Sequence, residues 1–169
     1  AKIIETDPIQ GYDEALRHAQ RLYANDPNTY WLCDQYSNEN NWKAHFFGTA
    51  EELIHQCDAE ITHFVSGVGT GGSMTGIGRK LKEKNPNITI VGIRPEEWPG
   101  IEGLKPLSSA DNIIPEIFDE SIVDDWIDIK ADEAQKWCLK AAQKGLFVGH
   151  SSGAYLAACE QVMKQIGSG

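Results

Sequence analysis

The chain has 169 residues, of which 41% are hydrophobic and 24% charged, and its formal net charge is −10. This length and composition are typical of one globular domain with a sizeable core. The acidic balance argues against a nucleic-acid surface, which needs a concentrated basic face, and no apolar run approaches the roughly 20 residues of a membrane span.

The first part of the chain alternates between strand-like and helical patterns. Residues 2–6 resemble a strand, residues 11–23 have helical periodicity, and residues 29–33 form a short apolar run that predicts a second strand. A polar loop, 34–41, follows that run, and its composition favours an exposed turn. A helix is predicted over 42–56. A domain rarely begins directly with its first strand, so we expect the chain to be a piece of a longer one.

Residues 61–84 carry the strongest pattern in the chain: a buried strand, a glycine-rich turn and an amphipathic helix. The strand covers 61–65, and the turn carries the hydroxyls of Thr70 and Ser73. Glycines let the backbone approach a ligand closely, and the start of a helix presents N–H groups and the positive end of its dipole. The turn therefore predicts a site for a phosphate group.

The same turn also satisfies the dinucleotide fingerprint G-x-G-x-x-G over residues 67–72. Its abundance of glycine and hydroxyl groups suits a compact phosphate monoester better than a pyrophosphate. A dinucleotide site also needs an acidic residue after the next strand, to bind the ribose hydroxyl. Here the predicted strand 88–93 is followed by Arg-Pro-Glu-Glu at 94–97, which leaves that acidic residue poorly defined. A third possibility is a turn that merely packs the helix against the strand.

The rest of the chain continues the alternation. Residues 95–115 hold four prolines and no clear periodicity, which is typical of a functional or mobile segment. A strand is predicted over 122–129, a helix over 131–143, and a short buried strand over 145–149. The last helix runs to about residue 166. Strands that alternate with helices predict a parallel α/β sheet.

A second strand-to-helix turn carries two small hydroxyl residues and a glycine, Ser151, Ser152 and Gly153. In a parallel sheet this turn and the glycine turn would open at the same edge, where ligands bind. Ser151 is then either a simple helix N-cap or a hydroxyl directed at a ring nitrogen of a ligand held by the first turn.

The cysteines and histidines are too scattered to predict a metal site. Four widely spaced cysteines match no zinc motif, which indicates reduced thiols of a cytosolic protein. His45 and His55 lie on one predicted helix, but not at the i, i+4 spacing of a metal pair.

Several segments together resemble the cysteine synthase group of fold-type II pyridoxal-phosphate enzymes, and in particular the O-acetylserine sulfhydrylase B branch. They are residues 61–78, 92–97, 114–118 and 145–154, in the order of that family. The resemblance covers nearly the whole chain. It implies a three-layer α/β fold with a mostly parallel sheet, similar to the tryptophan synthase β subunit but incomplete.

The resemblance also implies a domain division and an activity. Residues 1–28 would be the remnant of a smaller N-terminal α/β domain, and residues 29–169 the larger cofactor domain without its first and last strands. Family members bind pyridoxal 5'-phosphate and make cysteine by β-replacement from O-acetylserine and sulfide or another sulfur donor. The resemblance implies a cytoplasmic homodimer for the parent enzyme.

Carried over residue by residue, the resemblance assigns three kinds of contact. Ser151 would place its hydroxyl against the pyridine nitrogen, and Gln35 would bind the substrate carboxylate, which turns the polar loop into a site loop. Lys105 falls near the entrance for the sulfur donor. The residues that would hold the cofactor phosphate are Gly69, Thr70, Gly71, Gly72 and Ser73.

The sequence departs from the family in one decisive respect. None of its eleven lysines stands in the S-x-K-x-R type motif that carries the Schiff-base lysine, so no catalytic residue is assigned and the isolated chain is predicted to be inactive. His150 also departs from the family, which usually has a smaller or apolar residue directly before the serines. Two alternatives remain open: a nucleotide-binding Rossmann-like oxidoreductase domain, and a non-catalytic fragment that binds phosphate or a partner protein.

Overall fold

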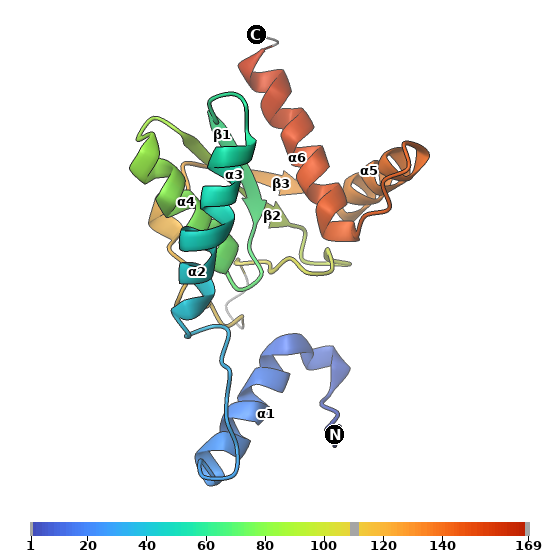
Figure 1. Ribbon diagram of the computed structural model, residues 1–169. Helices are drawn as coiled ribbons and strands as arrows, with labels where there is room; N and C mark the ends of the chain where they lie inside the picture. The colour runs from blue at the N-terminus through green and yellow to red at the C-terminus, as the bar shows by residue number, and fades with distance from the viewer. Residues whose placement is uncertain (1, 109–111, 168–169) are drawn as a thin grey trace.

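Three parallel strands form the centre of the protein, which a computed structural model describes over residues 2–108 and 112–167 (Figure 1). They are β1 (His63–Gly67), β2 (Thr89–Pro95) and β3 (Asp125–Ile129), hydrogen-bonded in the order β1-β2-β3. All pairs are parallel, and β2 lies between the other two. The predicted parallel α/β fold is therefore confirmed, and these three strands match the runs predicted at 61–65, 88–93 and 122–129.

One face of the sheet is covered by the helices before and after β1 (Figure 1). The predicted helix over 42–56 forms as α2 (Asn40–Ala44), a π-helical turn η2 (His45–Thr49) and α3 (Ala50–Gln56) in unbroken succession. The helix α4 (Gly72–Lys84) packs against α2 and η2. The buried residues of this layer are Ala50, Val68, Met74, Ile77, Leu81, Ile88, Ile90 and Ile122.

The opposite face is covered by α5 (Ala131–Gln143) and α6 (His150–Ile166), which pack against each other. Successive residues of β2 serve the two layers in turn: Ile90 joins the α4 side, whereas Val91 joins the α6 side. A strand buried on both faces is apolar throughout, which is why β2 was recognisable in the sequence. The fold is thus three-layered, as the resemblance implied.

The N-terminal part lies below this three-layer unit (Figure 1). A short helix η1 (Pro8–Gln10) leads into α1 (Gly11–Asn25), whose one buried residue is Asp13. Between β2 and the short helix η3 (Glu120–Ile122), the described residues contain no helix or strand, as the irregular composition indicated. No helix in the described part of the chain is both long and apolar enough to cross a membrane.

Three predicted strands, at 2–6, 29–33 and 145–149, are wrong: these segments carry no strand pairing in the structure. Their apolar side chains are largely exposed; Trp31 is 81% and Phe147 is 89% accessible. A strand exists only when its N–H and C=O groups pair with a neighbour, and apolar composition cannot supply that neighbour. The assignment of residues 1–28 and 29–169 to two domains stays a prediction.

Candidate functional site

The glycine turn has the geometry of an anion site. Strand β1 ends at Gly67, and α4 begins at Gly72 with Gly71 as its N-cap. Gly71 has φ of 82°, a left-handed conformation that favours glycine. The first N–H groups of a helix have no partner within it, so the turn directs donors and the positive helix end into the loop.

Close packing constrains the same glycines. A Cβ atom on Gly72 would lie 1.9 Å from the Asn41 Oδ1 atom, and one on Gly71 would lie 2.6 Å from the Phe118 Cβ atom. These glycines therefore have a packing role, although against α2 and Phe118 rather than between the helix and the strand. This role does not exclude an anion site, because packing against α2 leaves the direction of the helix N-terminus unchanged.

Asn41, which the sequence analysis did not single out, joins the two predicted loops. Its Nδ2 atom donates to the backbone oxygen of Gln35 at 2.8 Å and to the Thr70 Oγ1 atom at 3.1 Å. Thr70 Oγ1 also accepts from the backbone N–H of Gly72 at 3.3 Å. The polar loop is thus bonded to the glycine loop rather than being a free turn, a link that residues 29 positions apart do not reveal in sequence.

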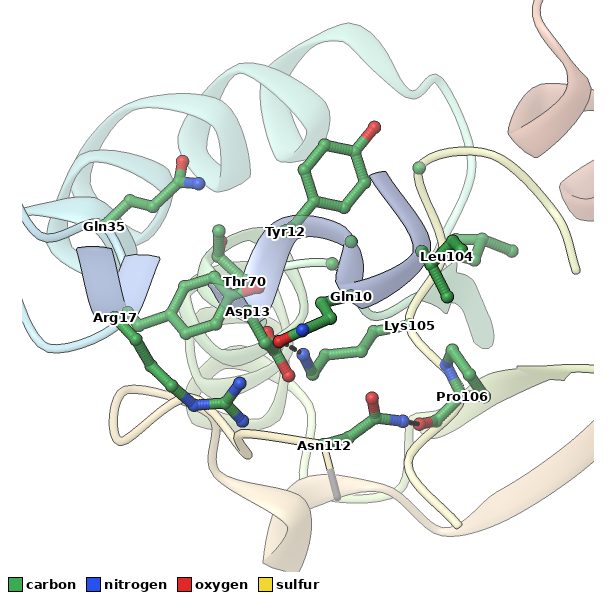
Figure 2. A pocket seen from close by; sticks show the side chains of 15 residues that line it. Gln10, Tyr12, Asp13, Arg17, Gln35, Thr70, Leu104, Lys105, Pro106 and Asn112 are labelled. Carbon is green, nitrogen blue, oxygen red and sulfur yellow. Dashed lines mark hydrogen bonds and ion pairs between the residues drawn. The ribbon is translucent and has the colours of Figure 1, made fainter. Parts of the chain in front are cut away.

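A cavity of about 820 Å³ lies between the start of α1, the polar loop, the glycine loop and the segment after β2 (Figure 2). It brings together Gln35, Gly69, Thr70 and Lys105. The described residues that line it are Ile9, Gln10, Gly11, Tyr12, Asp13, Arg17, Gln35, Tyr36, Gly69, Thr70, Gly103, Leu104, Lys105, Pro106 and Asn112.

The other predicted site residues lie beside the cavity rather than on its lining. Gly71, Gly72 and Ser73 form the N-cap and first turn of α4, next to Thr70. Ser151 adjoins the cavity wall, because a Cβ atom on Gly103 would lie 3.6 Å from the Ser151 Oγ atom. The seven predicted residues are therefore grouped around one region, although their contacts with a cofactor stay predictions.

The structure also resolves two points about the second turn. The N-cap of α6 is Gly149, so Ser151 lies in the first turn and the N-cap interpretation of this serine is wrong. His150 Nε2 lies 2.9 Å from the backbone oxygen of Ala131, the first residue of α5. His150 thus joins the starts of α5 and α6.

Lys105 lies in the cavity wall with its side chain only 10% exposed, and its charge is paired. Its Nζ atom lies 2.7 Å from the Asp13 Oδ1 atom and 5.2 Å from the centre of the Tyr36 ring. Burial by itself would raise the pKa of Asp13, but hydrogen bonds from Lys105 and from the Ile113 backbone outweigh it and hold the pKa below its ordinary value. Lys105 therefore acts here as half of an ion pair.

The profile of one family, described as pyridoxal-phosphate dependent enzymes, matches residues 1–169. The chain belongs to this family. It is 45% identical over 98% of its length to the cysteine synthase of Aquifex aeolicus, and 37% identical over 98% of its length to the cystathionine beta-synthase of Apis mellifera. A solved hydrogen sulfide-producing enzyme from Fusobacterium nucleatum superposes with a TM-score of 0.87 at 31% identity, covering 98% of this chain and 57% of that one.

The chain spans about half the length of the Aquifex enzyme, 51%, and 35% of the Apis enzyme. Family members use pyridoxal 5'-phosphate, and the residues of this chain suit it: a dianionic phosphate matches the donors at the start of α4, and the adjoining cavity has room for a ring. The relatives carry out different reactions, so the family does not fix one activity. No finding favours the nucleotide-binding oxidoreductase.

Proposed function

We propose that the protein containing these residues makes cysteine by pyridoxal-phosphate-dependent β-replacement, from O-acetylserine and a sulfur donor such as sulfide. The observation that carries the proposal is the convergence of Gln35, Gly69 and Thr70 on one cavity at the start of α4. The 45% identity to a cysteine synthase supports this reaction over others of the family.

Each group of residues would have a distinct task. The loop from Gly69 to Ser73 would bind the phosphate through backbone N–H groups and the positive end of α4. The Ser151 hydroxyl would face the pyridine nitrogen, and the Gln35 amide would orient the substrate carboxylate. When bound, the cofactor supplies an electron-accepting ring, and an uncharged serine partner at the nitrogen favours elimination over transamination.

Proton transfer at the substrate needs a base, which a lysine supplies in the family. Among the described residues that line the cavity, Lys105 is the one lysine, and its ammonium group is bonded to Asp13. Loss of a general base typically removes about 10²–10⁴ in rate. We therefore propose that this chain binds the cofactor phosphate without covalent attachment and does not turn over substrate alone.

The experiment compares the purified 169-residue chain with the full-length Aquifex cysteine synthase. Each is mixed with pyridoxal 5'-phosphate, O-acetylserine and sulfide, and both cysteine and released hydrogen sulfide are measured. We expect cofactor binding without cysteine formation by the chain, and activity when a segment carrying the family lysine is restored. Turnover by the chain alone that disappears on Lys43→Ala or Lys105→Ala would contradict this assignment.

The proposal extends to assembly. The resemblance implies a homodimer, and large apolar side chains such as Leu146 and Phe147 are exposed in this chain. Sedimentation of the protein that contains these residues, and of the 169-residue chain alone, would give the mass of each. A monomeric mass for the containing protein would contradict the proposed dimer.

A further inference from the structure

Helix α1 is attached to the rest of the protein by polar contacts rather than by an apolar core. Its apolar side chains, including Leu16 and Leu22, are partly buried or exposed and belong to neither core cluster, and Asp13 is its one buried residue. Figure 1 shows the helix outside the three layers that cover the sheet. An amphipathic helix is normally held by its apolar face, so another force must hold this one.

That force is concentrated on one carboxylate. The Asp13 side chain accepts from Lys105 Nζ through Oδ1 at 2.7 Å and from the backbone N–H of Ile113 through Oδ2 at 2.7 Å. Asp13 is only 7% exposed. Next to it, the Tyr12 hydroxyl donates to Glu102. Both oxygens of Asp13 thus bind the irregular segment that follows β2, at two points on either side of residues 109–111.

These contacts connect two walls of the cavity. One wall comes from η1 and α1, through Gln10 and Arg17 among others, and the facing wall comes from the segment that includes Leu104 and Asn112 (Figure 2). Asp13 bonds the first wall to the second at two points, and the hydrogen bond from Tyr12 to Glu102 adds another contact between them. Loss of the Asp13 contacts would loosen one side of the ligand-sized space beside the glycine loop.

We propose that Asp13 is a positioning residue whose carboxylate holds α1 against the segment after β2 and so forms the cavity. We call Asp13, Lys105 and Ile113 the Asp13 clamp. Removing one partner of a buried ion pair is far more damaging than removing an exposed pair, because the remaining charge is left without compensation. The clamp is independent of the proposed reaction, since it concerns the position of α1 alone.

Hydrogen–deuterium exchange of the 169-residue chain tests the clamp. In Asp13→Ala we expect at least about tenfold faster exchange in α1 and at the Ile113 amide, with α4 within about twofold of wild type, because the two regions open separately. Glu14→Ala is the matched control: its ion pairs with Arg17 and Arg21 are exposed, and Ile113 should exchange at the wild-type rate.

Conservative variants separate positioning from general destabilisation. Asp13→Asn keeps an acceptor for the Ile113 amide but loses the charge for Lys105, so α1 should loosen while Ile113 stays protected. Lys105→Arg should keep wild-type exchange in α1, whereas Lys105→Met should not. Wild-type exchange of α1 and Ile113 in Asp13→Ala, or equal acceleration of α4, would overturn the proposal.

Discussion

The glycine-loop wall and the α1 wall of the cavity are held in place by different forces. Helix α4, which follows the glycine loop, buries Met74, Ile77 and Leu81 against the sheet and its neighbours. Helix α1, which forms the other wall, is comparable in length but buries only Asp13. One cavity therefore has a wall fixed by apolar burial and a wall fixed by a few hydrogen bonds. The wall of a cavity can thus be held in place without belonging to the hydrophobic core.

The first test of this contrast truncates one apolar side chain in each helix. Met74→Ala should lower the free energy of unfolding by about 2–5 kcal/mol, because Met74 is completely buried. Leu16→Ala, at a partly buried position of α1 outside both core clusters, should lower it by less than about 1 kcal/mol. Urea denaturation followed by circular dichroism gives both values. Equal losses in the two helices would show that α1 also rests on apolar packing.

The second test adds one methyl group at the start of α4. Gly72→Ala should cost about 1–3 kcal/mol of stability, because the new Cβ would lie 1.9 Å from Asn41 Oδ1 and displace it. Gly48→Ala is the matched control: no atom lies within 4 Å of its Cβ position, and it should stabilise the helix by about 0.5–1 kcal/mol. A neutral Gly72→Ala in thermal denaturation would show that α2 is free to move away from α4.

The third test concerns the link between the polar and glycine loops. Asn41→Ala removes two hydrogen bonds that position Thr70 and Gln35. A net contribution of about 0.5–1.5 kcal/mol for such a bond predicts roughly two- to tenfold weaker binding of inorganic phosphate, measured by calorimetry. Asn40→Ala, one residue earlier, should leave the affinity unchanged. An unaffected affinity in Asn41→Ala would place the phosphate elsewhere.

The last and smallest effect is the response of α1 to acid. Because the pKa of Asp13 is held below its ordinary value, its contribution to stability is fully present above the ordinary aspartate pKa of about 4. It is lost as the pH falls through the lower pKa of the folded state. After correction for the intrinsic pH dependence of amide exchange, the protection of α1 should therefore fall on acidification in wild type. The same fall in Asp13→Asn would show that another carboxylate is responsible.

Much of the fold was predictable from local sequence. Burial on one or two faces gives an element a regular spacing of apolar residues, and this spacing is visible in the sequence. It predicted the strands β1, β2 and β3 and the helices α4, α5 and α6. Segments 29–33 and 145–149 have similar apolar composition but no pairing in the structure. Strand formation depends on a neighbour for backbone hydrogen bonds, and composition contains no information about that neighbour.

The candidate site divides in the same way. By itself the sequence determined the glycine turn between β1 and α4, because glycine, hydroxyl groups and a helix start are adjacent along the chain. Only the tertiary structure decided that Asn41 bonds to Thr70 and that Asp13 bonds to Lys105 and Ile113, partners 92 and 100 positions away. A hydrogen bond requires two atoms within about 3 Å of each other, and for residues so far apart that proximity arises only when the whole chain is folded.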